Sequence, residues 1–160
     1  LEKTEGNVEV SLGTNHLRVV LEGIVFITKL IDGRVPDNSK VVPKNQGKQI
    51  LVERDTFRET LGRVAILSNE KYRGVRFGLS DGAMTITAHN PEQEEAQEEL
   101  PINYKGDELE IGFNVNYINE AIGAVGSEQV EIGLNDPNSS CLIREPGKNN
   151  YLYVVMPMRL

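Results

Sequence analysis

Apolar residues alternate along three short stretches near the start of the chain, the third of which ends on Thr28. The stretches cover residues 8–12, 17–21 and 24–28, and the turn-forming segment 13–15 separates the first two. A period of two is typical of β-strands with one apolar side. We therefore predict a hairpin followed by a third strand.

A turn-rich segment from Asp32 to Ser39 follows the third strand and is the best domain boundary in the sequence. Three strands without a helix bury too little apolar surface to stand as a domain. Residues 1–38 are therefore expected to be the end of a domain whose beginning is missing. Residues 40–48 are polar and basic and contain Pro43, so we predict a connecting segment there.

Beyond this segment the spacing of apolar residues soon changes from that of a strand to that of a helix. A short strand over 50–52 leads into a helix near Asp55, on which apolar residues at helical spacing form one face. The residues of this face are Phe57, Leu61, Val64 and Ala65. Three strands are predicted next, over 75–79, 84–86 and 96–102, with a hairpin turn between the first two.

The remainder of the chain repeats this order. A strand over 109–113 precedes a helix that starts after the N-cap Asn114 and stops at Gly126. Three strands follow again, over 130–134, 141–143 and 151–155. The order strand, helix, strand, strand, strand thus occurs twice, which is an internal structural repeat. We predict an α+β domain, with two adjacent helices packed on one face of antiparallel sheets.

The composition is that of an ordinary globular protein. The 160 residues are 39% hydrophobic and 26% charged, a balance that differs from those of disordered and membrane-embedded chains. No apolar run is long enough to span a bilayer and no signal sequence opens the chain, so a cytoplasmic setting is expected. The formal net charge of −7 disfavours phosphate binding by the protein as a whole. A local basic lining would still attract DNA, because charges beyond about 10 Å are screened.

No part of the sequence has the spacing of a catalytic or metal site. Cys141 stands alone, and His16 and His89 lie in different segments without a second ligand three or four positions away. Gly74 and Gly78 lie within an alternating strand, whereas a phosphate loop would place them between a strand and a helix. We therefore predict no catalytic residue, no metal and no cofactor, and we interpret Cys141 as a small buried hydrophobe.

Five carboxylates fall within the eight residues from Glu92 to Glu99. Such a run is usually a solvated face, and an interface is the sharper interpretation. A hydrolase that uses acids of this run is an alternative, but their spacing does not favour it.

The last residues end a predicted strand with an apolar, flexible surface. Proline lacks the donor that a strand needs, so Pro157 is expected to end the strand and an exposed tail to follow. Met156 and Met158 flank this proline, and thioether side chains adapt to partners of varied shape. A frayed terminus with two core methionines is the alternative.

Five segments spread along the chain resemble the bacterial DNA polymerase sliding clamp family, the beta subunits, in the same order and at similar spacing. They are IDGRVPD (31–37), AILSNEKYRGVR (65–76), NPEQEEA (90–96), EIGFNV (110–115) and YVVMPMRL (153–160). The resemblance implies a DNA clamp fold built from three similar domains. Residues 1–38 would be the end of the second domain, and residues 39–160 would be the complete third domain.

The same resemblance implies a function without catalysis. A ring-shaped homodimer would encircle duplex DNA without reading its sequence, as a processivity factor of replication. It would tether the replicative polymerase, and it would dock the clamp loader and repair polymerases through short linear peptides. A head-to-tail ring needs two different edges. Only one is expected in this chain, so we predict a monomer. A free-standing α+β peptide-binding module is the alternative.

The resemblance also assigns residues, position by position. A groove beside the C-terminal strand would take the apolar side chains of a peptide such as Gln-Leu-x-Leu-Phe. The matching positions are Pro36, Lys40, Val41, Asn114, Tyr117, Asn138, Ser140, Val154, Met156, Pro157, Met158 and Arg159.

Two further surfaces are implied in the same way. An acidic strand edge and a helix end would form the interface between subunits, at Ile66, Leu67, Glu92, Glu94, Glu95 and Glu98. Basic side chains in the connecting segment, the first helix and the turn after it would face DNA phosphates. These are Lys40, Lys44, Lys48, Arg58, Arg63, Lys71, Arg73 and Arg76.

Overall fold

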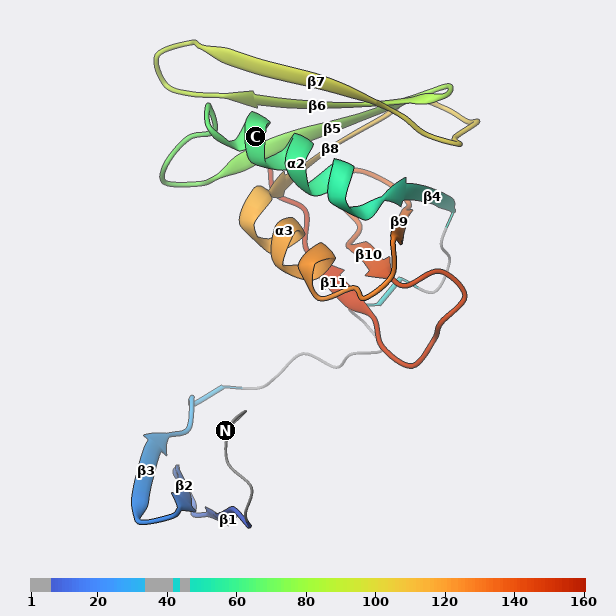
Figure 1. The fold of residues 1–160 in the computed structure, drawn as a ribbon. Coiled ribbons are helices and arrows are strands. Elements are labelled where there is room, and N and C mark those ends of the chain that lie inside the picture. Colours follow the sequence, from blue (N-terminus) through green and yellow to red (C-terminus); the bar gives the residue numbers. More distant parts are fainter. Residues whose placement is uncertain (1–6, 34–41, 44–46) are drawn as a thin grey trace. The chain divides into compact units, whose positions relative to one another are not determined.

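The computed structural model describes residues 7–33, 42–43 and 47–160. The chain divides into two compact units, Leu1–Pro36 and Asp37–Leu160. Their elements are labelled in Figure 1.

The described part of the first unit is a three-stranded antiparallel sheet in the order β1-β2-β3. The strands are β1 (Glu9–Leu12), β2 (His16–Leu21) and β3 (Ile24–Lys29), so the predicted hairpin and third strand are confirmed. Both faces of this sheet carry exposed apolar side chains. Phe26 and Ile27 are neighbours that project to opposite faces, and they are 57% and 60% exposed.

The described part of the second unit contains helices α2 and α3 and two four-stranded antiparallel sheets, ordered β11-β10-β9-β4 and β7-β6-β5-β8. Its elements are β4 (Lys48–Glu53), α2 (Arg54–Ala65), β5 (Gly74–Ser80), β6 (Ala83–His89), β7 (Glu95–Pro101), β8 (Leu109–Asn114), α3 (Val115–Gly123), β9 (Gln129–Leu134), β10 (Cys141–Arg144) and β11 (Tyr153–Val155). The predicted α+β class and the twofold repeat of strand, helix and three strands are confirmed. Lys48, predicted in the connecting segment, instead begins β4 because its backbone pairs with Leu134.

The two repeats exchange their first strands. β4 precedes α2 but pairs with β9 of the second repeat, and β8 precedes α3 but pairs with β5 of the first. Each sheet therefore contains strands from both repeats. The exchange joins the repeats into one body, with the two helices side by side (Figure 1).

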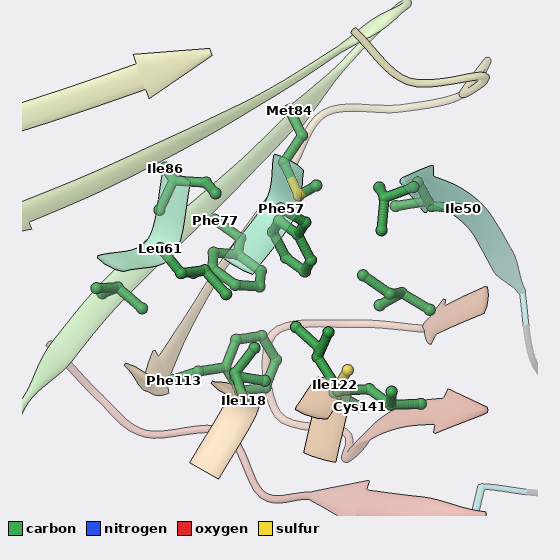
Figure 2. Close-up of a cluster of buried hydrophobic side chains, with 14 of the residues drawn as sticks. Ile50, Phe57, Leu61, Phe77, Met84, Ile86, Phe113, Ile118, Ile122 and Cys141 are labelled. Carbon is green, nitrogen blue, oxygen red and sulfur yellow. The ribbon is translucent and has the colours of Figure 1, made fainter. Parts of the chain in front are cut away.

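Three phenylalanines connect α2 to the sheet of β5 and β8 (Figure 2). The ring centroids of Phe57 and Phe77 are 5.8 Å apart, and those of Phe77 and Phe113 are 5.3 Å apart, in tilted arrangements. All three side chains are fully buried. The predicted apolar face of α2 is confirmed, because Phe57, Leu61, Val64 and Ala65 are all buried.

Helix α3 begins where the sequence predicts but ends earlier. The Asn114 side chain accepts a hydrogen bond from the Asn116 N–H at 2.9 Å, which confirms the N-cap. The helix ends at Gly123, so the predicted stop at Gly126 is wrong. The last turn tightens because the Val125 N–H bonds to the Ile122 carbonyl at 3.1 Å, and this turn brings the Val125 side chain into the core.

Candidate functional site

A hollow on the surface of the second unit lies between α3 and the C-terminal strand β11, and we call it the Tyr117 groove. Its volume is about 500 Å³. Helix α3 packs against β11 and exposes Tyr117 by 60%, while Met156, directly after β11, is 61% exposed. The lining residues are Tyr117, Glu120, Ala121, Tyr153, Val154, Val155 and Met156. A groove of this size and mainly apolar lining can accept apolar side chains of a partner.

Met156 is held in this groove by Ser140, which lies just before another strand. The Ser140 hydroxyl, which is buried, donates to the Met156 sulfur at 3.0 Å. Ser140 directly precedes β10, which pairs with β11 through Cys141 and Val155. The structure therefore brings together four residues that the resemblance assigns to the groove, Tyr117, Ser140, Val154 and Met156.

Asn114 and Asn138 do not line this groove. The Asn114 amide is engaged twice, because it caps α3 and also donates to the Tyr72 carbonyl at 3.1 Å. Asn138 is exposed in the turn before β10, where its N–H donates to the Asp136 carboxylate at 2.8 Å. Pro36, Lys40 and Val41 lie outside the described residues.

The prediction of an exposed tail after Pro157 is wrong in one respect. The Met158 N–H donates to the Gly112 carbonyl at 2.8 Å, which ties the C-terminal segment, residues 156–160, to β8. Met158 and Arg159 line a second hollow of about 380 Å³ rather than the Tyr117 groove. Its other lining residues are Asn69, Tyr72, Gly74, Arg76, Thr87, Ala88, His89 and Leu160. Pro157 separates the two hollows along the chain.

The acidic run forms the edge strand β7 and the turn before it. The turn is closed by Asn90, whose side-chain oxygen accepts from the Glu94 N–H at 2.9 Å. Glu92, Glu94 and Glu95 are exposed. Ile66 is 76% exposed and lines one hollow of about 440 Å³ together with Glu92, so two segments of the predicted subunit interface lie side by side.

Glu98 differs from its neighbours in the acidic run. Alternation along β7 places it on the same face as Ala96 and Leu100, towards α2, where the Arg63 guanidinium binds it through two hydrogen bonds. The hydrogen bond from Arg63 lowers the pKa of Glu98, and burial opposes this shift. Arg63 was predicted to face DNA and Glu98 to face a second subunit. In the structure each is the partner of the other.

The other predicted DNA-facing residues are spread over several elements. The Lys48 ammonium donates to the Asp107 carbonyl at 3.2 Å, Arg76 pairs with Glu110 at 3.2 Å, and Lys71 lies over the Tyr72 ring. Arg58 is exposed on α2, and Arg73, with a positive φ of 49°, is partly buried. Lys44, like Lys40, lies outside the described residues.

Reactive chemistry has few candidates in the described part of the chain. Burial raises the pKa of the Cys141 thiol to about 12, which keeps it protonated near neutral pH, and this agrees with its interpretation as a buried hydrophobe. Within residues 7–33, 42–43 and 47–160, no group of three or more histidine, cysteine or acidic side chains could hold a metal ion. No helix among these residues is long and apolar enough to cross a membrane.

Sequence reasoning missed part of the Tyr117 groove. Glu120 and Ala121 follow Tyr117 by three and four positions, and this spacing places all three on one side of α3. The period of the helix was therefore a usable signal for them. The approach of the C-terminal segment to Gly112 had no comparable local signal, because the two segments are far apart in sequence.

The fold and this groove define an α+β domain made of two interlocked repeats, with a mainly apolar groove beside its C-terminal strand. The family it belongs to follows from comparison with known proteins. Residues 39–159 match the model of the DNA polymerase III beta subunit, C-terminal domain, so the chain belongs to this family.

Relatives with the same name align along the whole chain. The chain is 48% identical over 160 residues to the "Beta sliding clamp" of Pseudomonas putida and 44% identical over 160 residues to that of Escherichia coli K12. Both alignments cover 100% of this chain and 44% of the relative, so the chain spans less than half the length of the curated relatives it matches.

Solved structures agree with this assignment. The DNA polymerase III subunit beta of Pseudomonas aeruginosa matches with a TM-score of 0.81 at 48% identity, covering 96% of this chain and 42% of that one. The beta protein of Caulobacter crescentus matches with a TM-score of 0.84 at 32% identity, covering 99% of this chain and 43% of that one. The expected clamp fold is confirmed.

Proposed function

We propose that the protein acts as a DNA sliding clamp, a non-catalytic processivity factor that works in the cytoplasm. Its relatives carry the name beta sliding clamp, and residues 39–159 match the C-terminal domain of that subunit. Residues 1–38 belong to the second clamp domain in this proposal, and residues 39–160 form the third. In this proposal the full-length subunit forms a ring-shaped homodimer that encircles duplex DNA without sequence specificity, whereas this chain by itself is a monomer.

The Tyr117 groove is the observation that carries this proposal. It presents an exposed aromatic ring and an exposed thioether beside a strand end, and such surfaces take apolar anchors of a short peptide. The partners are the replicative polymerase, the clamp loader and repair polymerases, each docking through a peptide such as Gln-Leu-x-Leu-Phe. A clamp structure from Pseudomonas aeruginosa bound to griselimycin supports a ligand-binding role for members of this family.

The subunit interface follows from the acidic turn and the end of α2. Ile66 and Leu67 supply apolar area, while Glu92, Glu94 and Glu95 orient a basic edge of the second subunit and raise the association rate. Glu98 contributes less than these three because Arg63 already neutralises it. The basic residues of the connecting segment, α2 and the turn after it attract DNA phosphates through loose contacts, which allow sliding because no register is favoured.

A peptide titration with matched variants tests the docking surface. We expect saturable binding of a labelled Gln-Leu-Ser-Leu-Phe peptide, measured by fluorescence anisotropy, and no binding of a scrambled peptide. Tyr117→Ala and Met156→Ala should each weaken binding about tenfold, because each removes an anchor-contacting side chain. Ile66→Ala removes an exposed apolar side chain outside the groove and should leave the affinity unchanged. Equal affinity of all three variants would contradict the assignment.

A further inference from the structure

Two glycines leave a bare patch on the sheet β7-β6-β5-β8. Val75 and Phe113 are fully buried in the core, and successive residues of a strand point to opposite faces. Gly74 on β5 and Gly112 on β8 therefore lie on the face away from the core. They are diagonal neighbours, because Gly74 pairs with Asn114 and Gly112 with Arg76.

The C-terminal segment lies on this patch at a distance that only glycine permits. A Cβ atom at Gly112 would lie 2.5 Å from the Met158 carbonyl oxygen and 2.8 Å from Leu160 Cγ. A Cβ atom at Gly74 would overlap the Leu160 side chain. The two obstacles differ in kind, because the one at Gly112 includes backbone and the one at Gly74 is the end of a flexible side chain.

This contact fixes the chain that follows Met156. The chain that precedes Met156 is held by β11, which ends at Val155 and pairs with Cys141. After Met156, the ring of Pro157 restricts the φ angle of that residue, and the Met158 N–H donates to the Gly112 carbonyl at 2.8 Å. Met156 and Pro157 are thus the two residues between the anchored Val155 and Met158, and the Met156 sulfur accepts from the Ser140 hydroxyl.

We infer that Gly112, assisted by Gly74, is a positioning residue for peptide binding: the bare patch seats residues 158–160 and thereby holds Met156 in the Tyr117 groove before a peptide arrives. The inference rests on the proposed function and adds to it a contact outside the groove that orders a residue of the groove. A groove wall that is already ordered loses less conformational entropy on binding, which raises affinity without a new contact.

The test compares alanine at three glycines of one sheet. Gly112→Ala should weaken peptide binding about tenfold and increase hydrogen exchange at the Met158 amide, while the unfolding midpoint changes little. Gly78→Ala is the matched control, because it lies on β5 in phase with Gly74 and its added Cβ would meet nothing closer than 3.9 Å. It should change neither the affinity nor the exchange rate.

Removing Leu160 separates the two glycines. In a Leu160→Ala background, Gly74→Ala should have no further effect on affinity, because the side chain it displaces is gone. Gly112→Ala should still weaken binding in that background, because the Met158 carbonyl remains in its way. This difference is not expected from a general loss of stability, which would affect both double variants.

Failure of the inference is distinct from failure of the proposed function. If the unmodified chain binds the peptide, and Gly112→Ala binds it equally with unchanged hydrogen exchange at the Met158 amide, the bare patch has no positioning role. If the Met158 amide is protected from exchange but the unmodified chain does not bind the peptide, residues 158–160 do contact the bare patch. The proposed docking function is then overturned, and with it the role assigned to Gly112.

Discussion

Arg63 and Glu98 join helix α2 to the edge strand β7 through two parallel hydrogen bonds, from Nε to Oε1 at 2.6 Å and from Nη2 to Oε2 at 2.7 Å. The Arg63 side chain is 54% exposed and the Glu98 side chain 32% exposed, so solvent weakens the attraction between them. The pair holds the middle of the acidic strand against the helix and removes one charge from the proposed subunit interface.

The strength of this pair can be measured by a double-mutant cycle. We expect Arg63→Ala and Glu98→Gln to show a coupling energy of at most about 1 kcal/mol in urea denaturation, because the pair is partly exposed. Glu99→Gln is the matched control, since Glu99 is adjacent and exposed on the other face of β7. Coupling between Arg63 and Glu99 as large as that with Glu98 would show that the two hydrogen bonds are not specific.

Acidification should remove the contribution of Glu98. The hydrogen bond from Arg63 holds the pKa of Glu98 below its ordinary value of 4.5 in the folded protein. An acid whose pKa is lower in the folded than in the unfolded protein stabilises the fold at a pH above its unfolded-state pKa. This stabilisation is lost as the pH falls through the folded-state pKa. Glu98→Gln should therefore lower stability near neutral pH and should flatten its dependence on pH below about 4.5. Parallel pH profiles for the two proteins would contradict this prediction.

The phenylalanine cluster should dominate the stability of the second unit. Phe77 contacts both other rings of the cluster and is fully buried. We expect Phe77→Ala to cost about 3–5 kcal/mol in free energy of unfolding, because it leaves a cavity between helix and sheet. Leu51→Ala, at a position 44% exposed on β4, should cost less than about 1 kcal/mol. Similar costs for the two variants would argue against this core.

Cys141 should react only when the fold opens. Its side chain is fully buried, and burial raises its pKa to about 12. Near neutral pH a reagent therefore cannot reach the sulfur, and the thiol is not ionised. We expect no labelling by a thiol-specific reagent in native buffer and complete labelling in denaturant. Rapid labelling of the native protein would show that β10 is accessible.

Local sequence patterns predicted most of the secondary structure. The period of two identified the strands, the period of 3.6 identified the buried face of α2, and Asn114 marked the start of α3. The exchange of β4 and β8 between sheets was not predicted, because strand pairing depends on contacts between distant segments. The early end of α3 was missed because Gly126 was a stronger local signal than the tightened turn at Val125.

The candidate site was predicted unevenly, for physical reasons. Tyr117, Val154 and Met156, which the resemblance assigned to one groove, meet because α3 packs on β11. Met158 and Arg159 lie elsewhere, because the backbone turns at Pro157 to reach Gly112. Glu98 could have been separated from the acidic run by its phase with Ala96 and Leu100, which places it on the face towards α2.

The most direct measurement of the central claim is a methyl NMR titration of the chain with the Gln-Leu-Ser-Leu-Phe peptide. The sequence contains three methionines. Met156 lines the Tyr117 groove, Met158 lines the second hollow, and Met84 is fully buried and serves as an internal control. We predict a saturable shift of the Met156 methyl with Met84 unchanged and no response to a scrambled peptide. A Met156 methyl that does not move at saturating peptide would contradict the docking surface assigned here.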